Sequence, residues 1–96
     1  MRVGCWECVM KHISTAVVYV QEANLGYPKY KYYAIGEMVH AEYELIQIDP
    51  DLANILRHYR REYFNLGFYP IDQVMTLLIG EFEYYEQESS DPSGRE

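Results

Sequence analysis

The chain of 96 residues lacks the long apolar run of about 20 residues that a helix needs to cross a bilayer. It has no basic N-terminal region followed by an apolar run and a cleavage site. With only two cysteines it cannot form the disulfide framework of a small secreted domain. We therefore expect a protein of the cytoplasm, or of an assembly built there, with no membrane contact.

Basic residues are also scarce, with 8 Lys and Arg against 15 Asp and Glu, for a net charge of −7. The imbalance is concentrated at the end of the chain, where the segment from Glu81 onward holds six acidic residues and one basic residue. Because nucleic-acid binding needs a basic face, this charge argues against it. No Ser, His and acid set and no glycine-rich phosphate loop is recognisable, so the sequence does not predict an enzyme.

Tyrosine is abundant by contrast, with 11 residues against three Phe and one Trp. A tyrosine side chain joins a large apolar ring to a hydroxyl group, which suits half-buried positions and protein interfaces. One small core cannot absorb so many rings. The excess predicts contacts with protein subunits, in a homo-oligomer or a larger assembly.

No segment alternates apolar and polar residues with the period of two of a half-buried strand, whereas four segments show helical periodicity. We predict an all-α fold, a small antiparallel bundle of about four helices built on a long N-terminal hairpin. Residues 1–88 form the domain, and 89–96 form a flexible acidic tail. The expected helices run from about Cys5 to Leu25, Tyr30 to Ile48, Pro50 to Gly67 and Pro70 to Gln87.

Two polar stripes with the same spacing of three and four residues flank the apolar faces of the first two expected helices. Each lies roughly 90° from the apolar stripe of its own helix, rotated in the same sense. In an antiparallel hairpin such stripes become neighbours. Their members are Cys5, Cys8 and His12 on the first helix and Glu37, His40 and Glu44 on the second.

These stripes predict a metal site, with zinc or iron bound by Cys5, Cys8, His12 and His40. Glu44 is the alternative fourth ligand. Two other interpretations remain open. In one, the cysteines are small buried residues and His12 is hydrogen-bonded to Glu44, because a turn at Tyr27 places these two side chains at one level. In the other, the cysteines at the helix start form a redox dithiol.

Two further groups of residues are candidates for contact with a partner. Arg57 and Arg61 share one face of the third helix and suit a phosphate or a carboxylate-rich partner such as the acidic tail, although a solvated face is the simpler interpretation. The segment GYPKYKYY holds aromatic and basic residues in the pattern that stacks single-stranded nucleic acid. With two lysines on an acidic protein, we favour protein contacts there, through Tyr27, Tyr30, Tyr32 and Tyr33.

The string Cys5-x-x-Cys8-x-x-Lys11-His12, followed by Gly26-Tyr27-Pro28, resembles small, largely uncharacterised helical proteins encoded in bacteriophage genomes. The similarity covers the first hairpin, about half of the chain. Those proteins have a histidine where this chain has Glu37, and an acidic residue about where it has His40. The resemblance implies no established activity.

Two hypotheses follow from the sequence. The first is a small structural or interaction protein, of a phage virion or of its assembly, that uses the tyrosine-rich surface and acidic tail for subunit contacts. The second is a metal-binding or redox thiol module that uses Cys5, Cys8 and His12.

Overall fold

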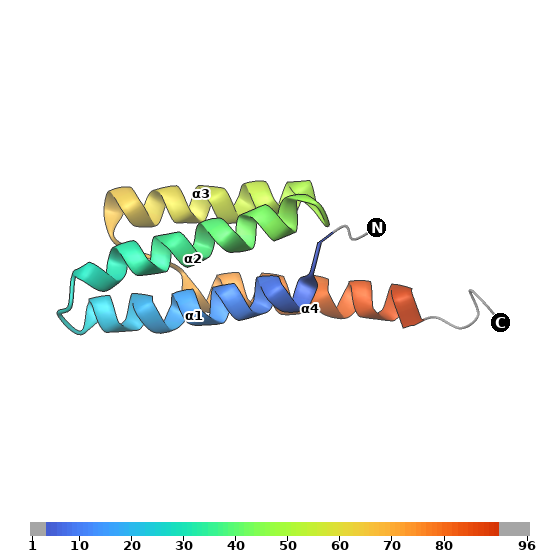
Figure 1. Cartoon of the computed structure of the whole chain (residues 1–96), viewed down its shortest axis with the longest axis horizontal. Helices are drawn as coiled ribbons and strands as arrows, with labels where there is room; N and C mark the ends of the chain where they lie inside the picture. The colour runs from blue at the N-terminus through green and yellow to red at the C-terminus, as the bar shows by residue number, and fades with distance from the viewer. Residues whose placement is uncertain (1–3, 91–96) are drawn as a thin grey trace.

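The structure is a computed structural model that describes the backbone of residues 4–90 and the side chains of residues 4–85. Four helices follow one another, and no strand occurs in the described range. The predicted all-α bundle is therefore confirmed. The helices are α1 (Trp6–Asn24), α2 (Lys29–Ile46), α3 (Pro50–Leu66) and α4 (Ile71–Ser90), and they run alternately up and down (Figure 1).

Local sequence signals set the ends of α1 and α3. Cys5 is the N-cap of α1, and its Sγ accepts a hydrogen bond from the N–H of Cys8 at 3.0 Å. Asp49 caps α3 in the same way by accepting from the N–H of Leu52 at 3.1 Å, with Pro50 in the first turn. Gly67 ends α3 in a left-handed conformation with φ of 81°, which glycine adopts without steric cost.

The hairpin of α1 and α2 is the most extensive helix pair of the fold. The apolar faces of the two helices pack against each other across it. Val17, at the edge of the α1 face, is half-buried, and so is Ile48, which we expected in the second helix but which lies after the end of α2. Alanine side chains along the seam let the two helices approach closely. The fully buried residues are Val9, Ile13, Ala16 and Val20 on α1 and Ala34, Met38, Ala41 and Leu45 on α2.

The other two helices cover opposite members of this hairpin, with α3 packed on α2 and α4 packed on α1 (Figure 1). Trp6, at the start of α1, contacts the rings of Phe82 and Tyr85 on α4, with ring centroids 6.0 and 5.5 Å away. Val74 and Leu78 supply the fully buried part of α4. The end of α4 runs past the first turn of α1, so this helix overhangs the bundle (Figure 1).

No helix in the described part of the chain is long and apolar enough to cross a membrane. Ser89 and Ser90, which we expected in the tail, belong to the last turn of α4. The rest of the predicted tail, 91–96, lies outside the described residues.

Candidate functional site

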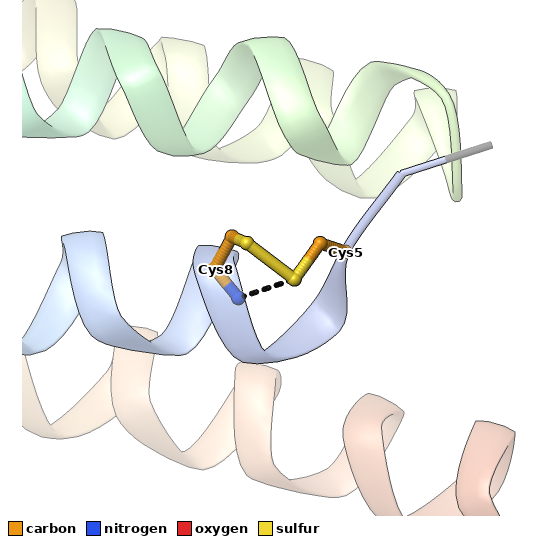
Figure 2. The surroundings of a disulfide bond; sticks show 2 residues. All are labelled: Cys5 and Cys8. Atoms are coloured by element: carbon orange, nitrogen blue, oxygen red, sulfur yellow. Dashed lines mark hydrogen bonds between the residues drawn. A yellow bond between two sulfur atoms is a disulfide. The ribbon is translucent and has the colours of Figure 1, made fainter. Parts of the chain in front are cut away.

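The two cysteines at the start of α1 are joined to each other in a disulfide (Figure 2). Their Cα atoms lie 5.1 Å apart, and both residues are half-buried rather than buried. A sulfur atom in a disulfide offers no thiolate to a metal ion. The predicted ligand set of Cys5, Cys8, His12 and His40 is therefore not assembled in this structure.

The histidine part of the prediction does come together, with a different acidic partner. Nδ1 of His12 on α1 lies 2.7 Å from Oε1 of Glu37 on α2. The ring of His40, one turn further along α2, lies edge-on to His12 with centroids 5.2 Å apart. One ligand atom from each of these three side chains can be chosen so that all lie within 4.8 Å of one another. We call His12, Glu37 and His40 the histidine cluster.

The expected hydrogen bond from His12 to Glu44 is replaced by the contact with Glu37, two turns nearer the start of α2. The helices end at Asn24 and resume at Lys29, so the hairpin turn is centred nearer Gly26 than Pro28. With this turn His12 is level with Ala41, between Glu37 and Glu44, and the structure pairs it with Glu37.

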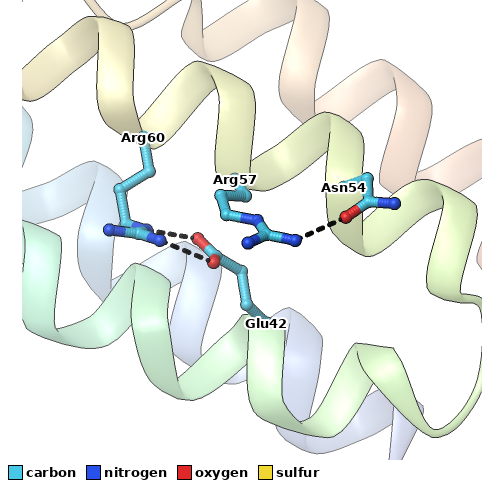
Figure 3. Close-up of polar contacts among 4 residues, drawn as sticks. All are labelled: Glu42, Asn54, Arg57 and Arg60. Atoms are coloured by element: carbon cyan, nitrogen blue, oxygen red, sulfur yellow. Dashed lines mark hydrogen bonds and ion pairs between the residues drawn. The ribbon is translucent and has the colours of Figure 1, made fainter.

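A buried ion pair that the sequence did not reveal joins α2 to α3. The side chain of Arg60 donates from Nε to Oε2 of Glu42 at 2.6 Å and from Nη2 to Oε1 at 3.1 Å (Figure 3). Glu42 is only 7% exposed, the one charged residue buried among the described side chains. Beside this pair, Arg57 donates to the side-chain oxygen of Asn54 at 2.7 Å. The pair therefore anchors Arg60 of α3 on α2, while Arg57 and Arg61 are exposed.

Two pockets of about 250 and 430 Å³ adjoin along the outer side of α2 and α3 and share Arg60. The α2 side is apolar apart from Glu42, which is paired with Arg60, and Tyr43 and Ile46 are 66% and 51% exposed there. The α3 side is basic, with Arg57 and Arg61 both exposed. We call this surface the α2–α3 groove; it is lined by Ile35, Val39, Tyr43 and Ile46 of α2 and by Arg57, Arg60 and Arg61 of α3.

The predicted tyrosine surface divides into two parts. Tyr27, Tyr30 and Tyr33 gather with Tyr19 at the turn of the hairpin, where neighbouring rings lie 5.4 to 6.4 Å apart. Tyr32 lies instead three residues before Ile35, in line with the apolar side of the groove, and is 64% exposed. Three of the four predicted tyrosines thus pack together with Tyr19 at the turn of the hairpin, and Tyr32 lies on the exposed face of α2.

The lysines of the same segment are engaged within the chain. Nζ of Lys31 donates to the backbone oxygen of Phe64 at 3.0 Å and lies 5.7 Å from the ring of Tyr63. Nζ of Lys29 lies 5.6 Å from the ring of Tyr30. These contacts favour a role in packing over the stacking of nucleic-acid bases.

Tyr69, between α3 and α4, is buried and lies edge-on to Tyr63. Burial, together with the nearby Glu42 and Tyr59, raises the pKa of the Tyr69 phenol above its ordinary value. This residue keeps its proton throughout the neutral range and acts as part of the core.

Comparison of the chain with protein-family models, with curated proteins and with solved structures finds no match.

Proposed function

We propose that this protein is a small structural protein that assembles with copies of itself through the α2–α3 groove. The observation that supports this is an apolar stripe on the solvent side of α2 beside a row of arginines on α3. Tyr32, Val39 and Tyr43 recur at helical spacing on the face opposite the core, where a helix of a monomer is normally polar. Exposed apolar patches rimmed by charge are typical of protein interfaces.

The groove suits an acidic amphipathic helix as its occupant. Apolar side chains of such a helix pack on α2, while its carboxylates pair with Arg57 and Arg61. The end of α4, from Glu81 to Ser90, has an acidic composition, with four glutamates in ten positions, and its Tyr84 is 56% exposed, whereas Phe82 and Tyr85 pack on Trp6. A helical segment of ten residues is about 15 Å long, close to the length of α2 from Ile35 to Ile46.

The position of α4 favours a contact in which its end enters the groove of a second copy. Its end overhangs the bundle next to the start of α1, on the opposite side of the hairpin from α3 (Figure 1). A groove in one copy that receives α4 of the next is a head-to-tail contact, which closes into rings or continues into filaments. This is the behaviour of a particle subunit, and the sequence resemblance to phage-encoded helical proteins fits it.

The test is the molar mass in solution, measured by light scattering after size-exclusion chromatography at low and high salt. We expect the wild-type chain to form oligomers that dissociate as salt screens the arginines. The Arg57→Glu/Arg61→Glu variant should be monomeric. Val18→Ser provides the control, because Val18 is an exposed apolar residue of α1 outside the groove, and it should assemble as the wild type does.

A charge exchange identifies the occupant. The Glu83→Lys/Glu86→Lys variant should also be monomeric alone. Mixed with the Arg57→Glu/Arg61→Glu variant it should form complexes, because the groove of one variant is then acidic and the end of α4 of the other is basic. A wild-type chain that stays monomeric at high concentration and low salt would contradict the proposal, and a mixture that stays monomeric would exclude α4 as the occupant.

A further inference from the structure

We propose that His12, Glu37 and His40 bind a divalent transition-metal ion, a site that is separate from the α2–α3 groove and from the cysteines. The cluster brings two imidazoles and one carboxylate together from both helices of the hairpin. Glu37 and His40 lie three residues apart on one face of α2, and His12 approaches them from α1. All three side chains are reachable, with those of His12 and Glu37 31% and 27% exposed.

The donor set decides the class of ion. Imidazole nitrogens suit zinc and its first-row neighbours, whereas calcium and magnesium prefer oxygen ligands only. Ligand atoms around a tetrahedral zinc ion lie about 3.4 Å apart, given bonds of about 2.0 to 2.1 Å. The chosen ligand atoms of the three groups lie within 4.8 Å of one another, so modest side-chain rotations of all three are needed to reach this spacing.

The close contact between His12 and Glu37 is compatible with this role. The 2.7 Å contact brings an imidazole nitrogen and a carboxylate oxygen together from the two helices, and both are atoms that bind transition-metal ions. Three protein ligands leave a further coordination position for water. Because the ligands come from α1 and α2, binding joins the two helices and should raise the thermal stability of the folded chain.

The experiment is a calorimetric titration of the full chain with Zn²⁺, paired with thermal unfolding followed by circular dichroism. We expect one zinc ion per chain and a higher unfolding midpoint. His12→Ala, Glu37→Gln and His40→Ala should each weaken binding by at least about tenfold. His40 is exposed, so its variant keeps the fold even if a change at His12 does not.

Two matched controls separate this site from its competitors. His58 on α3 lies 3.2 Å from Glu62 and is the remaining histidine of the chain, so His58→Ala removes an exposed His–Glu pair and should leave zinc binding unchanged. The Cys5→Ser/Cys8→Ser variant should also bind zinc with unchanged affinity. Substitution of Co²⁺ should give the visible absorption of nitrogen and oxygen ligands without a thiolate band.

Three results would overturn the proposal. Binding that survives His40→Ala at wild-type affinity would place the ion elsewhere, and binding lost in His58→Ala would assign it to α3. Loss of binding in the cysteine variant, together with a thiolate band in the cobalt spectrum of the wild-type chain, would show that Cys5 and Cys8 are the ligands. None of these outcomes depends on whether the chain assembles, because binding is measured per chain.

Discussion

Arg60 of α3 holds the buried carboxylate of Glu42 of α2 through two hydrogen bonds, at 2.6 and 3.1 Å. The planar guanidinium and the carboxylate meet side by side, the geometry that makes arginine pairs strong and directional. The pair lies under the α2–α3 groove, where both adjoining pockets include Arg60. It therefore anchors α3 on α2 at Arg60.

Loss of Arg60 should be costly, because it leaves the Glu42 carboxylate buried without its partner. We expect Arg60→Met to lower the free energy of unfolding by about 3 kcal/mol, measured by urea denaturation at neutral pH. The Glu42→Met/Arg60→Met variant should recover much of this loss, since it leaves no buried charge. A double variant less stable than Arg60→Met would show that the carboxylate is not the source of the cost.

Alkaline pH should destabilise the fold through Tyr69. Its pKa in the folded chain is raised, whereas in the unfolded chain it is about 10. The stability that Tyr69 contributes is therefore fully present below about pH 10 and is lost as the pH rises toward the folded-state value. Urea denaturation between about pH 8 and pH 11 should show this decline, and Tyr69→Phe should reduce its slope. An unchanged slope in Tyr69→Phe would assign the decline to other groups.

Gly4 should not tolerate a side chain. It has a φ of 120°, and a Cβ there would lie 2.6 Å from Cγ1 of Ile48 and 2.9 Å from the backbone oxygen of Glu44. We expect Gly4→Ala to lower the free energy of unfolding by about 1 to 3 kcal/mol. Gly80 is the matched control, because it is inside α4 and a Cβ there would meet nothing within 4 Å. Gly80→Ala should instead raise stability by about 0.5 to 1 kcal/mol. Chemical denaturation of both variants provides the comparison.

The helices could be predicted from the sequence because their signals are local. Asp49 and Pro50 mark the start of α3 by capping and by a fixed φ, and Gly67 marks its end. Apolar spacing likewise identified most of the buried residues of α1 and α2. On α4, helical spacing predicts a seam of Met75, Leu78, Phe82 and Tyr85. Leu78 is fully buried, but Met75 is only half-buried, and Val74, which that spacing leaves out, is fully buried.

The candidate sites depended on information that one helix does not carry. The partner of His12 depends on how α1 and α2 are placed against each other in three dimensions, and the spacing within either helix does not choose between Glu37 and Glu44. The burial of Glu42 depends on how α3 covers α2, whereas a glutamate in an isolated amphipathic helix is expected in solvent. Arg57 and Arg61 were recognised as a shared face, but only the tertiary structure places the apolar stripe of α2 beside them.

The helices are packed over surfaces of different extent, so they should differ in how easily each opens from the fold. The hairpin and α3 share broad buried seams, whereas α4 is docked on α1 through a short contact centred on Trp6, Val74 and Leu78. Segments with few buried contacts open at a lower free energy than the rest of a domain, and their amide hydrogens exchange first. The acidic end of the chain is thus carried on the helix that leaves the bundle most easily.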